Sequence, residues 1–207
     1  MAHADPLALV LLGAGRSMRF GSTDKLMAPF CGRPLIAWAA DAGRLLPAEW
    51  HLLVTGSDPS LAAATPGYRV LTNPAPEQGL SGSLRIAAAQ AELLGAAALV
   101  VMLGDMPFVS PTHLHQLVAA FGADETRPVF THPPQGAPTP PALFPATCFP
   151  ALKRLEGDRG ARALAAGARL IEADRETLMD IDTPDDIVRA EAVWRTARKK
   201  GMSPPSE

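Results

Sequence analysis

Residues 7–25 read Leu7-Ala8-Leu9-Val10-Leu11-Leu12-Gly13-Ala14-Gly15-Arg16-Ser17-Met18-Arg19-Phe20-Gly21-Ser22-Thr23-Asp24-Lys25, an apolar run that leads into a polar loop. The apolar part has the length and composition of a buried strand. Three glycines in the loop allow backbone N–H groups to approach a ligand closely, and such groups bind anions. Arg19 and Lys25 add positive charge. The stretch predicts a strand followed by a phosphate-binding loop, with a merely solvated basic loop as the alternative.

Two common phosphate motifs do not fit this loop. A dinucleotide fingerprint would use Gly13 and Gly15 and then require glycine where Met18 stands. A P-loop ends in Gly-Lys-Ser/Thr, whereas three residues separate Gly21 from Lys25 here. Neither motif therefore describes this loop.

The composition indicates one α/β domain. The chain has 207 residues, 47% of them hydrophobic, and a net charge of −2, which argues against a general nucleic-acid or membrane-surface binder. Cys31 and Cys148 are the only cysteines and form no Cys-x-x-Cys pair, so neither a disulfide scaffold nor a cysteine zinc site is expected. No apolar run approaches the ~20 residues of a membrane span, and no signal sequence opens the chain, so we expect a cytoplasmic protein. We expect the domain to cover residues 1–196, with a flexible tail at 197–207.

Strand and helix patterns alternate along the chain. Strands are predicted at 51–54, 69–71, 96–103 and 128–131, and helices at 35–46, 84–94, 111–121 and from 184 onward. The proline-dense segment 133–145 is expected to be a loop with a brief extended piece at 142–144. His113 and His115 flank an apolar helix stripe and are expected at the surface. This order predicts a three-layer α/β/α sandwich with a mainly parallel, Rossmann-like sheet.

The segment Asn73-Pro74-Ala75-Pro76-Glu77-Gln78-Gly79-Leu80-Ser81-Gly82-Ser83 is predicted to be a constrained loop that opens a helix. One serine, Ser81 or Ser83, is accounted for by capping that helix. Capping does not require the glycine at 79, so ligand binding is the second interpretation of this segment.

The sequence contains two acidic motifs, one directly after a predicted strand and one directly before a predicted helix. Asp105 comes directly after the apolar run 96–103, where open α/β sheets bind ligands, and a carboxylate there suits Mg²⁺. A turn aspartate bonded to its own backbone is the alternative. Near the end of the chain, Thr183 and Pro184 are expected to begin a helix. Capping leaves Asp180 and Asp182 unexplained, and alternation along a strand would put both on one side.

Together these motifs resemble the MobA-like nucleotidyltransferases. The first loop follows the family pattern L-A-[AG]-G-x-S-x-R-[MF]-G-x-x-K with one extra residue before Lys25, and Gly13 departs from the usual alanine. The later stretches are similar to N-P-x-x-x-x-G-x-S-x-S-L, G-D-x-P, G-D-x-G-A-R (157–162) and D-I-D-T-P-x-D. The resemblance implies a sheet of the nucleotide-diphospho-sugar transferase type and transfer of a nucleoside monophosphate from an NTP to a phosphorylated acceptor, with release of pyrophosphate.

The resemblance also implies roles for individual residues. Arg19, Lys25 and Asp105 would be catalytic, and Asp105 with Asp182 would hold Mg²⁺. Arg159, Arg162 and Asp180 would contact the acceptor. Nucleotide binding would involve Leu12, Gly13, Ala14, Gly15, Arg16, Ser17, Arg19, Lys25, Gly79, Leu80, Ser81 and Ser83.

The substrates implied by the resemblance are CTP and Mo-molybdopterin, as in molybdenum cofactor cytidylyltransferases. Ala14 is similar to the cytidylyl branch, and guanylyl relatives carry asparagines at the positions of Asp180 and Asp182. Against this, the frame 140–144 lacks the histidine usual in cytidylyltransferases, and Met106 stands where glutamine is common. GTP as donor, or a sugar or polyol phosphate as acceptor, is the first alternative. The second is a non-catalytic nucleotide-binding or cofactor-delivery partner of a molybdoenzyme.

Overall fold

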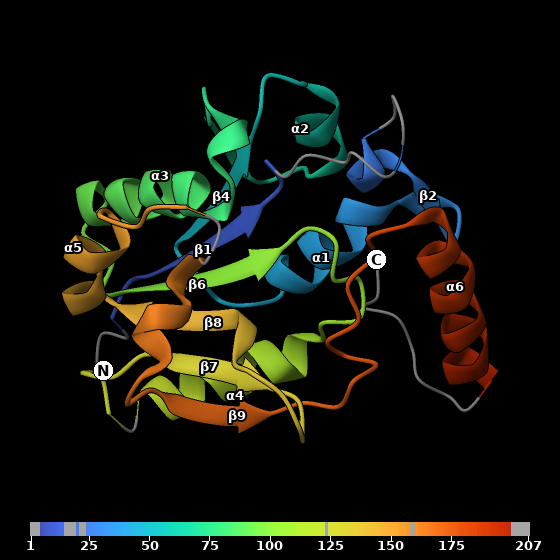
Figure 1. Ribbon diagram of the computed structural model, residues 1–207. Coiled ribbons are helices and arrows are strands. Elements are labelled where there is room, and N and C mark those ends of the chain that lie inside the picture. The colour runs from blue at the N-terminus through green and yellow to red at the C-terminus, as the bar shows by residue number, and fades with distance from the viewer. Residues whose placement is uncertain (1–4, 15–19, 21–23, 123, 158–159, 200–207) are drawn as a thin grey trace.

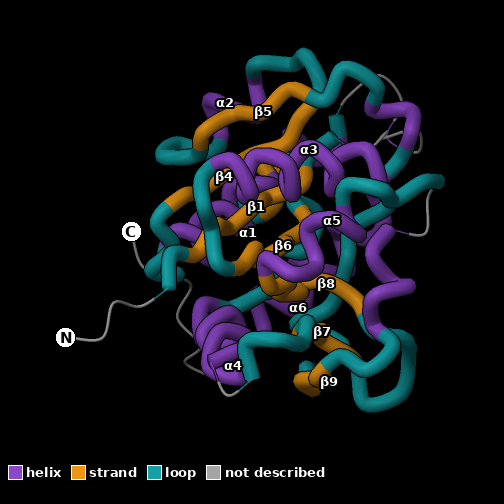
Figure 2. Tube along the Cα trace, turned by 90° about the vertical axis from the view of Figure 1, so that its left-hand side faces the viewer, coloured by secondary structure: helices purple, strands orange, loops and turns teal. Residues whose placement is uncertain are grey.

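The computed structural model describes residues 5–14, 20, 24–122, 124–157 and 160–199. A seven-stranded sheet in the order β5-β4-β1-β6-β8-β7-β9 forms its centre, and Figure 2 shows this order from top to bottom. The strands of this sheet are β1 (Leu7–Leu12), β4 (Trp50–Thr55), β5 (Arg69–Thr72), β6 (Ala98–Leu103), β7 (Val129–His132), β8 (Thr139–Pro145) and β9 (Arg169–Glu172). A small antiparallel pair consists of β2 (Pro29–Phe30) and β3 (Arg33–Pro34).

Helices cover both faces of the sheet. They are α1 (Leu35–Arg44), α2 (Ser60–Ala64), α3 (Leu80–Leu93), α4 (Pro111–Gly122), α5 (Phe149–Leu152) and α6 (Pro184–Lys199). Helices α3 and α5 lie against one face, and α1 and α4 lie against the other (Figure 1). The three-layer α/β/α architecture predicted from the sequence is confirmed. Among the described residues, no helix has both the length and the apolar content that a bilayer crossing requires.

The central strands contribute side chains to two separate hydrophobic cores, one on each face of the sheet, because successive side chains of a strand point to opposite faces. In β1, Leu9 and Leu11 pack with α1, whereas Ala8 and Val10 pack with α3, and all four are fully buried. Burial on both faces explains why residues 7–12 are apolar without alternation. Strand β1 pairs in parallel with β4 and β6, so the ends of all three strands open toward the same edge of the sheet.

Strand β8 is longer than the sequence predicts. The expected brief extended piece at 142–144 is a seven-residue strand, Thr139–Pro145, which runs antiparallel to both β6 and β7. Its prolines stand at 140, 141 and 145, near the two ends, where a strand tolerates a missing N–H most easily. The paired middle, Ala142–Phe144, is buried.

Two further local predictions are wrong. Helix α3 begins at Leu80 rather than after Ser83, so Gly79 is its N-cap residue and neither serine caps it. His113 is 5% exposed rather than superficial, because its Nε2 atom lies 2.8 Å from Oγ1 of Thr131 on β7. His115 is exposed, as expected.

Helix α6 packs away from the main layers, against the β2–β3 pair and α1 (Figure 1). The Trp194 ring lies 4.7 Å from that of Trp38 and 6.3 Å from that of Phe30, between ring centroids. Next to this aromatic contact, the Cys31 N–H donates to Oε1 of Glu191 on α6 at 3.1 Å. These contacts hold α6, and with it the segment 180–183, beside the ends of β1 and β6.

Candidate active site

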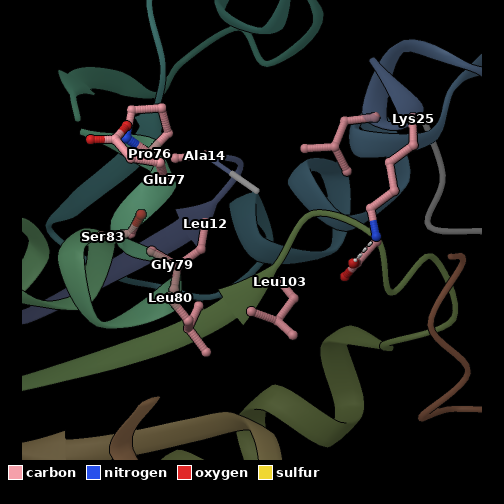
Figure 3. A pocket seen from close by; sticks show the side chains of 11 residues that line it. Leu12, Ala14, Lys25, Pro76, Glu77, Gly79, Leu80, Ser83 and Leu103 are labelled. Atoms are coloured by element: carbon pink, nitrogen blue, oxygen red, sulfur yellow. Dashed lines mark hydrogen bonds and ion pairs between the residues drawn. The ribbon is translucent and has the colours of Figure 1, made fainter. Parts of the chain in front are cut away.

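A cavity of about 380 Å³ opens at the carboxyl ends of β1 and β6. Its lining combines ends of strands with the segment before α3, and consists of Leu12, Ala14, Lys25, Leu26, Pro76, Glu77, Gly79, Leu80, Ser83, Leu103 and Asp105. In Figure 3, Lys25 lies on one side of this cavity, and Gly79, Leu80 and Ser83 lie on the other. The edge of the sheet where parallel strands end is where open α/β sheets bind ligands.

The first wall is the end of β1. Hydrogen bonds from Gly13 N–H to the Val54 carbonyl (2.8 Å) and from Gly104 N–H to the Leu12 carbonyl (3.0 Å) hold it between β4 and β6. A Cβ atom added at Gly13 would lie 3.4 Å from its nearest neighbours, so the alanine usual in the family would fit there. Four residues predicted to bind nucleotide, Gly15, Arg16, Ser17 and Arg19, lie outside the described residues.

The second wall is the segment before α3. Gly79 has φ 75° and ψ −163°, a backbone conformation that glycine alone adopts readily, so the turn itself requires this glycine. The Asn73 side chain donates to Oγ of Ser83 at 3.1 Å and accepts from Ala75 N–H at 3.0 Å. Ser83 lines the cavity, whereas Ser81 is buried, is absent from its lining and has an Oγ atom without a hydrogen-bond partner in the described part of the chain.

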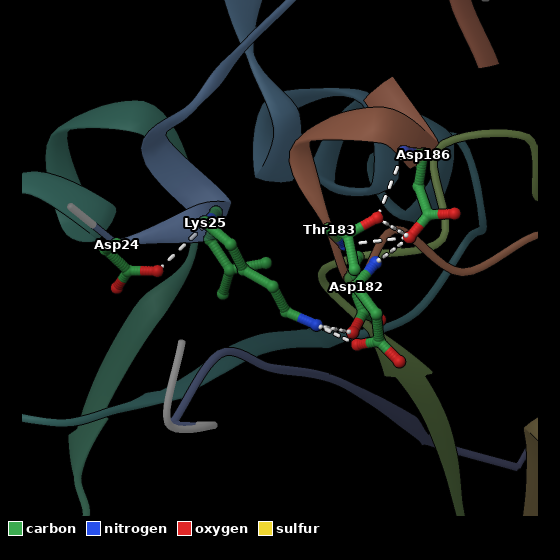
Figure 4. Close-up of polar contacts among 7 residues, drawn as sticks. Asp24, Lys25, Asp182, Thr183 and Asp186 are labelled. Atoms are coloured by element: carbon green, nitrogen blue, oxygen red, sulfur yellow. Dashed lines mark hydrogen bonds and ion pairs between the residues drawn. The ribbon is translucent and has the colours of Figure 1, made fainter. Parts of the chain in front are cut away.

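Lys25 reaches two carboxylates from distant parts of the chain. It begins a short 3-10 helix, Lys25–Met27, whose first turn is capped by Asp24, with Leu26 buried as the anchor. Its Nζ atom lies 2.7 Å from Oδ2 of Asp105 and 2.8 Å from Oδ1 of Asp182 (Figure 4). The side chains of Lys25 and Asp105 are 12% and 19% exposed, so this pair is largely shielded from water, whereas the Asp182 side chain is 48% exposed.

The segment 180–183 is fixed to the end of β6 by its backbone. The Ile181 N–H donates to the Asp105 carbonyl at 3.0 Å, and the Ile181 side chain is fully buried. On the far side, one oxygen of Asp186 accepts from the N–H groups of Asp182 and Thr183 and from the Thr183 hydroxyl (Figure 4). Thr183 caps α6, as predicted, because its Oγ1 accepts from Asp186 N–H at 3.2 Å. The segment is not a strand; these bonds, rather than strand alternation, place Asp182 beside Lys25.

Burial and the neighbouring charges shift the pKa values of Lys25 and Asp180. Burial alone would lower the pKa of Lys25, but the charges and hydrogen bonds of Asp105 and Asp182 outweigh it, so the pKa of this ammonium is raised. Burial raises the pKa of Asp180, and the neighbouring carboxylates of Asp182 and Asp105 raise it further. Among the described residues, the two carboxylates bonded to Lys25 and the nearby carboxyl of Asp180 thus outnumber the one ammonium.

The donor set suits Mg²⁺ held partly by substrate. The Oδ1 atom of Asp105 is buried and has no hydrogen-bond partner within the described ranges, so it is available to a cation. No group of three or more His, Cys, Asp and Glu side chains at metal-binding distance occurs among the described residues. Mg²⁺ commonly uses one or two carboxylates, with phosphate oxygens and water completing its shell, so Asp105 and Asp182 fit this ion.

Two further cavities adjoin the first at Leu103. One, of about 250 Å³, is lined in part by Leu80, Arg162 and Asp180. The other, of about 400 Å³, is lined in part by Arg175 and Asp180. Of the predicted acceptor residues, Arg162 and Asp180 therefore share a cavity, and Arg159 lies outside the described residues.

Sequence reasoning missed several lining residues. Glu77, Leu103, Thr139 and Arg175 line these cavities without being predicted as site residues. For Leu103 a signal was present, since it directly precedes the Gly104-Asp105 pair at a strand end. Thr139, at the start of β8, and Arg175, in the loop after β9, carry no such signal, because only the tertiary fold brings them to the cavities.

Comparisons with known proteins identify the family of this chain. The model of the MobA-like NTP transferase domain family matches residues 9–175. The chain is 31% identical over 197 residues to a molybdenum cofactor guanylyltransferase from Cereibacter sphaeroides, covering 90% of this chain and 96% of that protein. It is 43% identical over 121 residues to the purine catabolism protein PucB of Bacillus subtilis, but spans only 57% of PucB.

Solved structures are similar over nearly the whole chain. Rv0371c from Mycobacterium tuberculosis H37Rv superposes with a TM-score of 0.77 at 30% identity, covering 92% of this chain and 99% of that one. A second structure of Rv0371c, in complex with manganese, has a TM-score of 0.73 at 26% identity and covers 91% of this chain and 99% of that one.

Proposed function

The chain belongs to the MobA-like NTP transferase family and is a nucleotidyltransferase, and from this premise we propose that it transfers a nucleoside monophosphate from a magnesium-bound NTP to a phosphorylated acceptor at the cavity of Lys25 and Asp105. The observation that carries the proposal is the convergence of Asp105 and Asp182, 80 and 157 residues away in the chain, on the ammonium of Lys25, which lines the cavity together with Asp105.

The chemistry requires positive charge and alignment. An acceptor phosphate oxygen attacks the α-phosphorus of a triphosphate, and pyrophosphate leaves with the electron pair of the broken bond. Because both reactants are anions, the site must neutralise them and hold them in line. Mg²⁺, when bound, neutralises phosphate charge. Lys25 is placed to stabilise the charge that grows at the α-phosphoryl group, and Asp105 and Asp182 would hold the cation.

We assign each substrate to one part of these adjoining cavities. The nucleotide would occupy the cavity between β1 and the start of α3, where Ala14, Gly79 and Ser83 provide small side chains beside its base and ribose. The acceptor would occupy the adjoining cavities around Asp180, with Arg162 as a partner for its negative charge. Leu103 forms a wall shared by all three cavities, and Asp105 lines the first, so the reacting groups would meet near these two residues.

We propose CTP as the donor and Mo-molybdopterin as the acceptor. Support comes from Ala14 and from the acids at 180 and 182, which are similar to the cytidylyl branch of the family. A molybdoenzyme that receives the product is the corresponding partner. GTP is the second candidate donor, because the relative that this chain covers to 96% is named a guanylyltransferase.

Pyrophosphate release tests the proposal. Purified protein with Mg²⁺ is given CTP, GTP, ATP or UTP, each with and without Mo-molybdopterin. We expect release that needs both Mo-molybdopterin and one preferred NTP, with formation of the corresponding dinucleotide. If pyrophosphate is released with a sugar or polyol phosphate but not with Mo-molybdopterin, the proposed acceptor is wrong and the sugar or polyol phosphate takes its place. Nucleotide binding without release under any condition would overturn the enzymatic proposal in favour of a binding role.

A further inference from the structure

The Lys25 ammonium lies where the two metal-binding carboxylates face each other. Its Nζ atom is within 2.8 Å of Oδ1 of Asp182 and within 2.7 Å of Oδ2 of Asp105. A cation held by both carboxylates would compete with the ammonium for these oxygens, since two positive charges at such short distance repel each other. Lys25 therefore already supplies one of the two positive charges that a divalent cation would bring to these carboxylates.

We infer that Lys25 is an internal substitute for the divalent cation, which keeps the nucleotide-free protein from binding that cation tightly. The inference deepens the proposed function and rests on it for the identity of the incoming ligand. In the nucleotide-free protein, the Lys25 ammonium occupies one oxygen of Asp105 and one of Asp182 and offsets one of their two negative charges. When a triphosphate enters the cavity, its oxygens offer the ammonium a second set of partners, and the carboxylates become free for the cation.

The position of Lys25 makes this exchange local. Lys25 and Asp105 both line the cavity assigned to the nucleotide, so the ammonium can turn to phosphate oxygens without movement of the fold. Its backbone is anchored by the buried Leu26 and by the Asp24 cap, so only the long side chain must move. The two carboxylates are held in place without Lys25. The backbone of Asp105 follows β6 and accepts from Ile181 N–H, and the backbone of Asp182 donates to Asp186.

The exchange has a thermodynamic consequence. Because coupling between two ligands is reciprocal, a nucleotide that draws Lys25 away must raise the affinity for the cation, and the cation must raise the affinity for nucleotide by the same factor. The cation and the NTP would then be loaded together, and the site would stay closed to free divalent ions.

Titration of Mn²⁺ into nucleotide-free protein tests the inference without turnover. We expect Lys25→Met to bind Mn²⁺ at least about tenfold more tightly than the wild type, the scale of a typical coupling between sites. Lys25→Gln is a second neutral variant with the same expectation. Lys25→Arg keeps the charge and should bind Mn²⁺ as weakly as the wild type. Lys153→Met is the matched control, because Lys153 pairs with Glu92 on α3, outside the cavity.

The outcomes separate this inference from the proposed function. Equal or weaker Mn²⁺ binding by both folded neutral variants would overturn the inference, as would tighter binding by Lys25→Arg. Tighter binding by the neutral variants alone would support it. Absence of pyrophosphate release by the wild type would contradict the proposed function and leave the titration result standing. A thermal unfolding midpoint for each variant shows that it is folded.

Discussion

The Asn73 side-chain amide donates a 3.1 Å hydrogen bond to Oγ of Ser83, and both residues are 3% exposed. This bond joins the residue that follows β5 to the first turn of α3. The segment between them carries Pro76, Glu77 and Gly79 into the cavity lining. The shape of this wall thus depends on one buried polar pair.

Replacement of Ser83 by alanine should therefore weaken both the fold and nucleotide binding. The Asn73 amide would be left without this acceptor in a buried place, which costs about 1–3 kcal/mol of unfolding free energy. We expect the KM for the NTP to rise more than kcat falls, because the wall is displaced while Lys25 and Asp105 remain. Chemical denaturation and steady-state kinetics measure the two effects.

Ser81→Ala is the matched control for that variant. The Ser81 hydroxyl is buried without a partner in the described residues, so its removal should leave the unfolding free energy unchanged or higher. Equal losses of stability in the two variants would show that the Asn73–Ser83 bond does not carry the effect.

Asp186 should control the placement of Asp182. One of its oxygens accepts from two backbone N–H groups and from the Thr183 hydroxyl, so Asp186→Ala releases the segment that carries Asp182. We expect a loss of about 0.5–2 kcal/mol in stability, the range for lost helix caps. We also expect a fall in kcat at saturating NTP, partly restored in Asp186→Asn. Asp185→Ala, at the neighbouring exposed position, should change neither quantity.

Some strands, helices and site residues could be predicted from the sequence, and others could not. The strand at 7–12 and the acid at 105 were predictable, because burial on both faces makes a strand uniformly apolar and parallel strands end at one edge. The strand Thr139–Pro145 was not, since its prolines are strand breakers locally and only pairing with β6 and β7 stabilises it. Helix α3 begins at Leu80 because of the backbone conformation of Gly79. A prediction based on capping by serine side chains does not take this conformation into account.

Contacts between distant segments were the hardest to predict. The family resemblance predicts that Lys25 and Asp105 act on the same bound nucleotide. It does not predict that the two side chains form an ion pair with each other. His113 lies off the apolar stripe of its helix and becomes buried because Thr131 of β7 offers it a partner. Such a partner leaves no local pattern in the sequence.

Burial of His113 predicts a pH dependence of stability. Burial lowers its pKa from the ordinary 6.5, so the unfolded chain binds a proton more readily than the folded one. Its contribution is fully present above pH 6.5 and is lost as pH falls from there through the lowered pKa of the folded state. Denaturation at several pH values should show this slope in the wild type and a smaller one in His113→Asn. His115→Gln, on the exposed face of the same helix, should keep the wild-type slope.

The most direct measurement compares nucleotide binding with the single-turnover rate of transfer in Lys25→Ala and in the wild type, with Lys153→Ala as the control for loss of a lysine. The site described above predicts that Lys25→Ala still binds the preferred NTP with Mg²⁺, while the transfer rate falls by about 10²–10³-fold, the usual effect of removing one group that stabilises transition-state charge. A transfer rate in Lys25→Ala equal to that of the wild type would contradict the assignment of catalysis to the cavity shared by Lys25 and Asp105.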